Sequence, residues 1–572
     1  MRWQVSPQVN NEFLDKFPEL SPIMATLLFN RGLQTQSAID QFLSPDYSQD
    51  IHDPYLFKDM NKACEVVYQA IKNQDLITVF GDYDADGVPA AVILTTVLER
   101  LGAKVEVYLP HREKEGYGLN KLAIEELARS DARRAKTKTK LLITCDCGIS
   151  NAEEIELANS LGLQVIITDH HAIPVNLPQA LAIIHPQVEG ETYPFKFLCG
   201  GGVAFKLVQA LLRHKNCSLE KAEAERQEKW LLDLVAIATV ADMVPLTGEN
   251  RTLVKYGLIV LKKTQRLGLQ KMILVAGIDI NKLDTTMISF AFAPRINAAG
   301  RMDHANLAYH LLNTQDEAKA LAWAEELNQA NIQRQKITET VFKEAKNQAP
   351  DLKAKLLFFY KADWPAGLTG LVASKLVKEF NRPAILLTNS DEETIVGSGR
   401  SIEGFHITEA LQQNADLLLR FGGHPQACGF SLKKENLASF QANMQALANK
   451  QIKDEELEPV LKVELELDLM AINWELVDTL DKFQPYGQQN TEPLFADYGV
   501  LVTGAKKVGK DQNHWKLELV KQNKKLGAIA FSLGKIELSL GQRIDIVYNL
   551  NINQWNGTRQ IQLIIRDLKI SS

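Results

Sequence analysis

Three carboxylates stand at alternate positions just after an apolar run of the chain. Asp82, Asp84 and Asp86 follow residues 76–80, which have the composition of a short buried strand. Carboxylates this close together repel one another and raise each other's pKa. A divalent cation among them removes that cost, and hard ions such as Mg²⁺ and Mn²⁺ prefer oxygen ligands of this kind. The stretch therefore indicates either a metal site or an acidic, solvated turn between a strand and a helix.

The residues that could complete a metal site follow other apolar runs. Such runs alternate with segments of helical pattern, which is typical of a mostly parallel sheet with helices on both faces. Ligands of these sheets bind beyond the carboxyl ends of the strands. We therefore expect the polar groups that end the runs to converge at one edge. The runs are 105–109, 141–144, 165–168 and 182–184, and the groups are Asp82, Asp84, Asp86, Asp146, Asp169, His170 and His171, with Asp242 after the run 234–241.

The expected chemistry is hydrolysis of a phosphate ester. A donor set rich in carboxylates with one or two imidazoles suits Mn²⁺ or Mg²⁺ better than Zn²⁺. Several carboxylates could bridge two ions, which would stabilise the attacking and leaving oxygens of a phosphoryl displacement and activate water as the nucleophile. The sequence contains neither a G-x-x-x-x-G-K-[ST] loop nor a nucleophile elbow, so nothing points to ATP hydrolysis or to a serine hydrolase.

Composition limits the class of protein. The 572 residues are 45% hydrophobic and carry a formal net charge of −6, so a nucleic-acid partner would need a local cationic groove. The six cysteines form no C-x-x-C pair, which argues against a structural zinc site and fits a reducing compartment. No segment has a signal core or the ~20 apolar residues of a membrane span. We expect a soluble, cytoplasmic protein without a membrane partner.

The pattern along the chain predicts an α/β protein followed by a β-barrel. Ser21 and Pro22 are typical of a helix start in an N-terminal helical segment. Alternating short strands near the C-terminus indicate a small barrel of the OB type. The predicted segments are the helical residues 1–60, the parallel-sheet domain 61–304, one long connecting helix over 305–349, a smaller α/β domain over 350–448, and the barrel over 458–572.

The motifs resemble those of a known superfamily. Residues 81–87, Asp146, the Asp169-His170-His171 sequence and Asp242 are similar to the first four motifs of the DHH phosphoesterases. Residues 422–430 resemble the DHHA1 domain that accompanies them. Within the superfamily the chain is similar, over roughly 20 to 570, to the RecJ family of single-strand-specific 5′→3′ DNA exonucleases. The segments that carry this closer likeness are 115–119, 197–200, 203–206 and 293–302.

The resemblance implies a metal shell and contacts to phosphate. His171, after Asp169, would contact the scissile phosphate, with the alternative that it holds His170 in one tautomer. The shell would hold Mn²⁺ or Mg²⁺, with two ions, through Asp82, Asp84, Asp86, Asp146, His170 and Asp242. The phosphate contacts would come from Arg295, Asn297 and Arg301.

Further residues are expected to bind the rest of the substrate. The glycines and hydroxyls of residues 396–401 could cradle a phosphate with backbone N–H groups, and in the family Ser398, Arg400 and Arg112 would hold the 5′-phosphate. A loop at His424 would close over the nucleotide. In the barrel, aromatic rings suit base stacking and cations suit the backbone, whereas Phe531 is expected in the core. The barrel residues are Trp515, Tyr548 and Trp555 with Lys506, Lys507, Lys510 and Arg559.

Four further features of the sequence depart from the family pattern or allow two interpretations. After Gly87 the family usually has a small hydroxyl residue near the start of the helix, whereas this chain has Pro89 there. After Trp364 the family usually has His, whereas this chain has Pro365. The cationic run 133–140 could be a solvated loop or a surface that faces DNA. Asn328, Asn331, Arg334 and Gln335 on the long helix could face the substrate channel, although a plain connector is favoured.

The resemblance implies a metal-dependent single-stranded-DNA exonuclease that releases 5′-mononucleotides. It would act in recombination and DNA repair, with a single-strand-binding protein and a helicase as possible partners. A cleft too narrow for a duplex would explain the preference for single strands. Two alternatives remain: a DHH-type phosphodiesterase for oligoribonucleotides or small nucleotides, and a non-catalytic single-strand-binding factor.

Overall fold

The computed structural model describes residues 1–112, 114–129, 138–348, 351–555 and 557–571. The chain divides into two compact units, of which the first combines residues 1–52, 243–256 and 460–572, and the second combines 53–242 with 257–459. Most of the cationic run 133–140 lies outside the described residues, so its role stays a prediction. Among the described helices, none has the length and apolarity needed to cross a bilayer.

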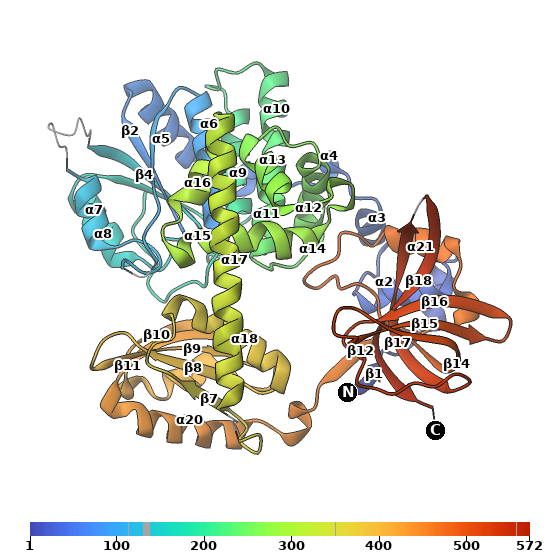
Figure 1. Cartoon of the computed structure of the whole chain (residues 1–572). Coiled ribbons are helices and arrows are strands. Elements are labelled where there is room, and N and C mark those ends of the chain that lie inside the picture. Colours follow the sequence, from blue (N-terminus) through green and yellow to red (C-terminus); the bar gives the residue numbers. More distant parts are fainter. Residues whose placement is uncertain (113, 130–137, 349–350, 556, 572) are drawn as a thin grey trace. The chain divides into compact units, whose positions relative to one another are not determined.

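A five-stranded parallel sheet in the order β3-β2-β4-β5-β6 forms the centre of the second unit (Figure 1). Gly81 pairs in register with Cys145, and Cys145 pairs with Thr168, so three neighbouring strands end at the same level. The predicted parallel sheet is therefore confirmed. The strands are β2 (Leu76–Gly81), β3 (Lys104–Tyr108), β4 (Thr139–Cys145), β5 (Gln164–Thr168) and β6 (Ala182–Ile184).

Helices cover the sheet on both faces. One face carries Phe80, Leu142 and Ile167, which are buried in one cluster with side chains of α7 and α8. Helices α5, α6 and α9 contact the sheet and one another, and successive strand residues point to opposite faces. These helices are α5 (Met60–Asn73), α6 (Gly87–Arg100), α7 (Lys121–Leu127), α8 (Ala152–Ser160) and α9 (Gly200–Arg213).

The apolar run that precedes Asp242 is a helix, α11 (Leu232–Ala241), and not a further strand. Leu234, Val235 and Ile237 are all fully buried. A helix that is buried on every side gives a continuous apolar run, which periodicity alone does not distinguish from a buried strand. Asp242 is the C-cap of this helix, so it reaches the sheet edge from a helix end.

The predicted single helix over 305–349 is two helices, α16 (Asn306–Asn313) and α17 (Glu317–Asn347). Asp316 ends the connection because its side chain accepts hydrogen bonds from the N–H groups of Ala318 and Lys319 and caps α17. The remaining helical elements of this unit are η1 (Pro54–Leu56), α10 (Lys221–Trp230), α13 (Leu267–Ala276), η3 (Ile280–Lys282), α14 (Thr285–Met287), the π-helical turn η4 (Ile288–Phe292) and α15 (Ala293–Met302), while α12 (Gly248–Leu261) begins in the first unit.

The second sheet of this unit has the order β10-β11-β9-β8-β7. Residues 396–401 fall mostly in β9, a strand paired on both sides, so the predicted phosphate cradle of free backbone N–H groups is wrong. His424 likewise ends a strand and is not in a loop. The elements are β7 (Leu357–Tyr360), α18 (Ala366–Phe380), β8 (Ala384–Asn389), β9 (Thr394–Arg400), α19 (Ile407–Gln412), η5 (Ala415–Leu417), β10 (Leu418–His424), β11 (Ala427–Lys433), η6 (Lys434–Asn436), α20 (Leu437–Gln451) and η7 (Asp454–Leu457).

The first unit is a closed barrel, which confirms the predicted OB fold. The order is β13-β14-β15-β16-β18-β17, and a further pairing of β14 with β17 closes the sheet. The strands are β13 (Leu465–Glu466), β14 (Phe495–Val508), β15 (His514–Lys521), β16 (Lys524–Ala530), β17 (Arg543–Trp555) and β18 (Thr558–Ile570). Other elements are β1 (Arg2–Val5) paired with β12 (Val460–Val463), and the helices α1 (Asn11–Lys16), α2 (Pro22–Asn30), α3 (Gln36–Leu43), α4 (Tyr47–Asp50), η8 (Leu469–Ala471) and α21 (Trp474–Asp481).

The N-terminal helices share the hydrophobic core of the barrel. Ser21 caps α2 and Pro22 occupies its first turn, as predicted. Leu27 and Phe42 lie in one buried cluster with barrel side chains. Arg251, from the segment 243–256, is almost fully buried between Phe42 and the segment 482–485. Its guanidinium donates to the carbonyl oxygens of Phe42, Lys482, Phe483, Gln484 and Pro485.

Candidate metal centre and phosphate site

The acidic residues converge at the carboxyl edge of the parallel sheet. Asp82, Asp146 and Asp169 directly follow β2, β4 and β5. Asp86 stands at the start of α6 and accepts hydrogen bonds from the N–H groups of Gly200 and Gly201 at 2.7 and 2.6 Å. These N–H groups open helix α9, where the helix dipole favours an anion.

Glycine is required at this helix start because the backbone approaches the acidic cluster closely. A Cβ on Gly200 would lie 2.4 Å from Asp146 Oδ1, and one on Gly201 would lie 2.5 Å from the Ala238 Cβ. The sequence prediction noted residues 197–200 as part of the resemblance but assigned them no role. The glycines at 200 and 201 let the first N–H groups of α9 come close enough to donate hydrogen bonds to Asp86.

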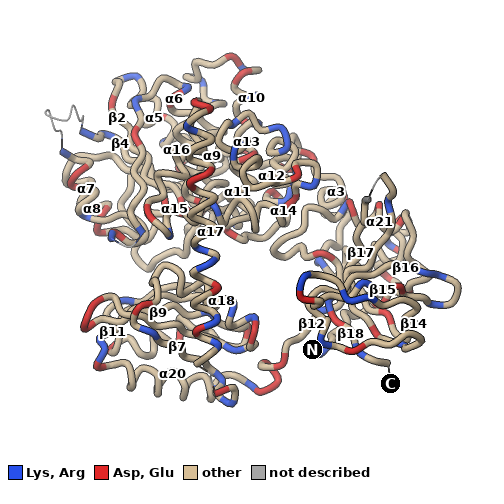
Figure 2. The backbone as a smooth tube through the Cα atoms, viewed as in Figure 1, with Lys and Arg blue, Asp and Glu red and all other residues tan. Residues whose placement is uncertain are grey.

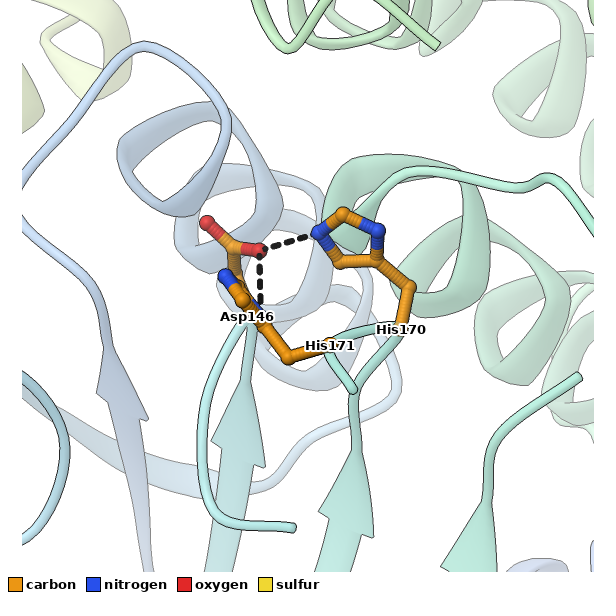
Figure 3. Close-up of side chains that lie close together, drawn as sticks. All are labelled: Asp146, His170 and His171. Atoms are coloured by element: carbon orange, nitrogen blue, oxygen red, sulfur yellow. Dashed lines mark ion pairs between the residues drawn. The ribbon is translucent and has the colours of Figure 1, made fainter. Parts of the chain in front are cut away.

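His170 and Asp146 lie at the centre of the cluster. Asp146 Oδ1 is 3.1 Å from His170 Nε2 and 3.8 Å from His171 Nδ1 (Figure 3). His170 Nε2 also lies 3.7 Å from Asp86 Oδ2 and 3.6 Å from Asp242 Oδ2. Three groups have donor atoms within 4.8 Å of one another: Asp146 with His170 and His171, Asp86 with His170 and Asp242, and Asp82 with Asp84 and Asp146.

The residues present fit a divalent cation. Asp82 Oδ1, Asp146 Oδ1 and His170 Nε2 are buried and form no hydrogen bond with the described residues, although the last two atoms lie 3.1 Å apart. Buried polar atoms are normally satisfied, because an unsatisfied one costs about 1–3 kcal/mol. A carboxylate oxygen and a neutral imidazole nitrogen are both metal donors, so one type of ligand would satisfy all three atoms.

The pKa values of the clustered side chains also indicate a site for a cation. Burial raises the pKa of Asp82, Asp146 and Asp242 well above the ordinary value, and repulsion from neighbouring carboxylates raises it further. Burial and the repulsion of Asp84 raise the pKa of Asp86 to about 6. Burial, with repulsion from His171, lowers the pKa of His170 to about 3, so its imidazole is neutral and able to coordinate. The carboxylates need a positive charge to be stable as anions.

Asp169 orients His171 and does not join the metal-donor groups among the described residues. Its Oδ1 lies 2.8 Å from His171 Nδ1 and also accepts the N–H groups of His170 and His171, while Oδ2 accepts the N–H of Ile149. Burial alone would lower the pKa of His171, but the hydrogen bond to Asp169 and its charge outweigh burial and raise the pKa to about 9. His171 is therefore a cation at neutral pH.

Tyr117 is a contact of this histidine that the sequence did not predict. Its hydroxyl donates to the backbone oxygen of Asp146 at 3.1 Å and lies 2.9 Å from His171 Nδ1. Glu115 holds the loop that carries Tyr117 and Arg112. Its carboxylate accepts hydrogen bonds from Tyr108 Oη, Asn120 Nδ2 and the N–H of His111. Glu115 and Tyr117 belong to a segment noted only for its resemblance.

Four arginines gather beside the acidic cluster. Burial and repulsion from Arg112, Arg334 and Arg400 lower the pKa of Arg301 to about 9. Among the described residues, none of the four forms an ion pair with a carboxylate; Arg301 Nη1 donates to the Gly367 oxygen, and Arg400 Nη1 donates to the Gly399 oxygen. The charge of Asp84 offsets part of the repulsion at Arg301, but arginines without a direct ion pair in the described chain can still bind an anion such as phosphate. For Arg334 the sequence allowed two interpretations, a side chain that faces the substrate channel or part of a plain connecting helix.

Other predicted phosphate contacts have protein partners. Asn297 Oδ1 accepts the N–H of Ala85 at 2.9 Å, so it fixes the acidic turn. Arg295 donates from Nε and Nη2 to Asn328 Oδ1 and from Nη1 to the Ala291 oxygen. Ser398 Oγ accepts the hydroxyl of Thr369. Burial lowers the pKa of His424, and repulsion from His171 lowers it further.

The predicted stacking residues of the barrel require correction. Trp515 is 6% exposed and its Nε1 donates to the Ile536 oxygen, so it fills the core. Tyr548 is fully buried as well. The side chain of Trp555 lies outside the described residues. Phe531, expected in the core, is 50% exposed and contacts the His514 ring. The cation Lys506 pairs across strands with Lys516, and both are exposed. Acidic and basic residues are interspersed along the backbone of both units (Figure 2).

Comparison with known proteins identifies the same three domains. Sequence models of the DHH family N-terminal domain, the DHHA1 domain and the RecJ OB domain match residues 76–239, 353–450 and 463–567. The single-stranded-DNA-specific exonuclease RecJ of Bacillus subtilis (strain 168) is 38% identical over 578 residues, covering 100% of this chain and 71% of that protein.

Two solved structures are similar over the whole chain. The crystal structure of RecJ in complex with Mn²⁺ from Thermus thermophilus has a TM-score of 0.83 at 29% identity and covers 100% of this chain and 80% of that one. The structure of RecJ in complex with Mg²⁺ from the same organism has a TM-score of 0.78 at 27% identity, with 100% and 79% coverage.

Proposed function

Because the chain belongs to the RecJ family of single-stranded-DNA-specific exonucleases, we propose that it hydrolyses single-stranded DNA from the 5′ end and releases 5′-mononucleotides. The observation that carries this proposal is the meeting of two opposite charge clusters. Buried Asp82, Asp146 and His170 offer unpartnered donor atoms, and beside them Arg301 lies among arginines that lack carboxylate partners in the described chain.

Divalent cations fit the acidic cluster, and we propose two ions of Mn²⁺ or Mg²⁺. Support for two comes from the three donor groups, since Asp146 belongs to two of them and His170 belongs to two. The proposed donors are Asp82, Asp84, Asp86, Asp146, His170 and Asp242. When bound, such ions would supply Lewis acidity to the phosphodiester and to the attacking water.

The protein's own groups position and neutralise the substrate. Asp169 holds His171 as an imidazolium, which is suited to donate a hydrogen bond to the scissile phosphate. Arg112 and Arg400, with Ser398, bind the 5′-phosphate in this proposal, while Arg301 faces the next phosphate. Anchoring the 5′-terminal phosphate places cleavage one nucleotide from the end. This geometry would give both the direction of digestion and the mononucleotide product.

The exposed Phe531, whose ring contacts the half-buried ring of His514, is the better candidate for base contact in the barrel, since Trp515 is buried. From the family resemblance we also propose a role in recombination and repair in the cytoplasm, with a single-strand-binding protein and a helicase as partners. The match to an OB domain supports a polymeric substrate over a small nucleotide.

The test is cleavage of 5′-labelled single-stranded and duplex DNA with Mn²⁺, by the wild type and by Asp146→Ala. We expect labelled mononucleotide from the single strand only, and none from the variant. Asp416→Asn, an exposed aspartate away from the cluster, is the matched control and should cleave normally. Binding of single strands without cleavage by the wild type would contradict the enzyme and leave a binding factor.

A further inference from the structure

A cavity of about 560 Å³ lies between η4, α15 and α17 in the second unit. Its walls include Ile278, Phe290, Arg295, Asn328, Ile332 and Gln335. The volume is in the range of small-ligand sites. Helix α15 leads from this cavity to the acidic turn, because Asn297, two residues after Arg295, accepts the N–H of Ala85.

One wall of the cavity presents apolar surface to solvent. Phe290 is 74% exposed and Ile332 is 49% exposed. Phe290 belongs to the π-helical turn η4, and turns of this kind are rare and frequent at functional sites. An exposed ring face at the edge of a cavity is the feature that single-strand-binding proteins use to stack nucleobases.

The other wall is polar and cationic. Arg295 is held by Asn328 Oδ1, and Arg334, one residue from the lining of α17, donates to Asn331 Oδ1 at 2.9 Å. The buried Nε of Arg334 has no hydrogen-bond partner in the part of the chain that the structure describes. Within the described chain, neither arginine has a carboxylate at ion-pair distance. The one acidic residue in the lining, Asp279, lies 3.8 Å from Lys282 Nζ.

The cationic wall continues into the phosphate site. Arg334 is close enough to Arg301 to lower its pKa by repulsion, and Arg295 does the same to Arg334. A positive track therefore runs from Arg301 through Arg334 to Arg295. If a DNA strand is anchored by its 5′-phosphate, its next phosphates lie along these arginines. The bases of those nucleotides then lie beside the arginines.

We propose that this cavity is a nucleobase subsite for a nucleotide on the 3′ side of the scissile phosphate. The base stacks on Phe290 against Ile332, the amides of Asn328 and Gln335 face its edge, and Arg334 with Arg295 binds the adjoining phosphodiester. This inference rests on the proposed exonuclease function. It assigns Phe290 and Arg334 to substrate binding and adds recognition of the strand beyond the nucleotide that is released.

A scan with abasic sites tests the subsite. The substrates are 5′-phosphorylated single strands in which one abasic site is moved along the first nucleotides, with Mn²⁺ present. For the wild type we expect KM to rise about tenfold when the abasic site occupies one position, since a stacked base contributes about this factor to binding. Phe290→Ala should have the raised KM on normal DNA, an unchanged kcat, and no further response to an abasic site at that position.

Two further variants complete the design. Leu122→Ala removes a comparably exposed apolar side chain from α7, 79% exposed, and should retain the wild-type pattern. Arg334→Gln should raise KM for all sequences and reduce the salt dependence of binding by about one charge. Cleavage by Phe290→Ala with the wild-type abasic pattern would overturn the subsite alone. Absence of cleavage by the wild type would overturn the proposed function together with the subsite.

Discussion

Substituting Asp146 by Asn should stabilise the metal-free protein while it abolishes activity. The side chain keeps its shape, and the backbone tolerates the change because Asp146 has φ 61°, a conformation that Asn also adopts readily. The substitution removes one charge from a buried cluster in which Asp146 Oδ1 has no hydrogen-bond partner among the residues that the structure describes. Without a cation, the Asp146 charge destabilises the fold, first through burial and then through repulsion from the neighbouring carboxylates.

The size of the effect follows from the geometry. Two ionised carboxylates whose oxygens lie within 4.8 Å of each other repel by at least about 3.5 kcal/mol at an effective dielectric constant of ~20. Burial and repulsion together have a similar effect at Asp86, where the rise in pKa from 3.8 to about 6 corresponds to about 3 kcal/mol of instability at neutral pH. We therefore expect Asp146→Asn to gain about 2 to 4 kcal/mol, or roughly 5 °C in Tm.

Thermal unfolding with chelator and with Mn²⁺ measures both parts of the prediction at pH 8. In chelator, Asp146→Asn should melt above the wild type. With Mn²⁺ the order should reverse, because the wild type gains stability from binding and the variant has lost a donor. The pH dependence has a defined sign: carboxylates with raised pKa destabilise the fold as pH rises, so the wild type without metal should lose stability as pH rises from about 4 through 6 and above.

Asp416→Asn is the matched control, because this exposed carboxylate lies outside the cluster. Its Tm should stay within the small range of surface substitutions, with or without Mn²⁺. If Asp146→Asn lowered the Tm in chelator at pH 8, the carboxylates would not be repelling one another, and the electrostatic argument for a cation would fail.

Three further predictions concern positioning and stability. Glu115→Gln puts an amide N–H₂ among donors from Tyr108, His111 and Asn120 and should loosen Arg112, so the kcat/KM preference for 5′-phosphate over 5′-hydroxyl ends should fall about tenfold. Asp169→Asn removes the interaction that keeps His171 protonated, so NMR titration of the metal-free protein should show the pKa of His171 fall from about 9 toward 6.5. In the wild type this interaction stabilises the fold below pH 6.5 and is lost as the pH rises through about 9, and the variant should lack this pH-dependent stabilisation. Arg251→Met leaves buried carbonyls unpaired and should cost the first unit about 3–5 kcal/mol, seen as faster hydrogen exchange in β14 and β17.

The metal donors could be predicted because topology places them together. Parallel strands end at one edge, so Asp82, Asp146 and Asp169 were expected to meet from the order of the elements alone. The run before Asp242 was less informative, since a fully buried helix and a buried strand have the same apolar composition. The break before α17 had a local signal, Asp316 as a cap, which the helical periodicity on both sides concealed.

In the barrel, the alternation of side chains along the strands predicts which aromatic residues are buried. Trp515 has the same parity as Leu517 and Leu519, so alternation alone places it on the buried face of β15. Phe531 has the opposite parity to Ala528 and Ala530, which are buried. The exposed Phe290, and Arg334 with no carboxylate partner in the described chain, had no such signal, because their roles depend on which elements pack beside α17.

The composition of the first unit has a consequence for synthesis of the chain. Residues 1–52 leave the ribosome well before residues 460–572, the barrel strands that cover Leu27 and Phe42. At ordinary elongation rates the interval is roughly 20 to 80 seconds. During that time the N-terminal helices expose an apolar face, so a nascent chain stalled before residue 460 is a substrate for chaperones, and C-terminal truncations should aggregate although the second unit is complete.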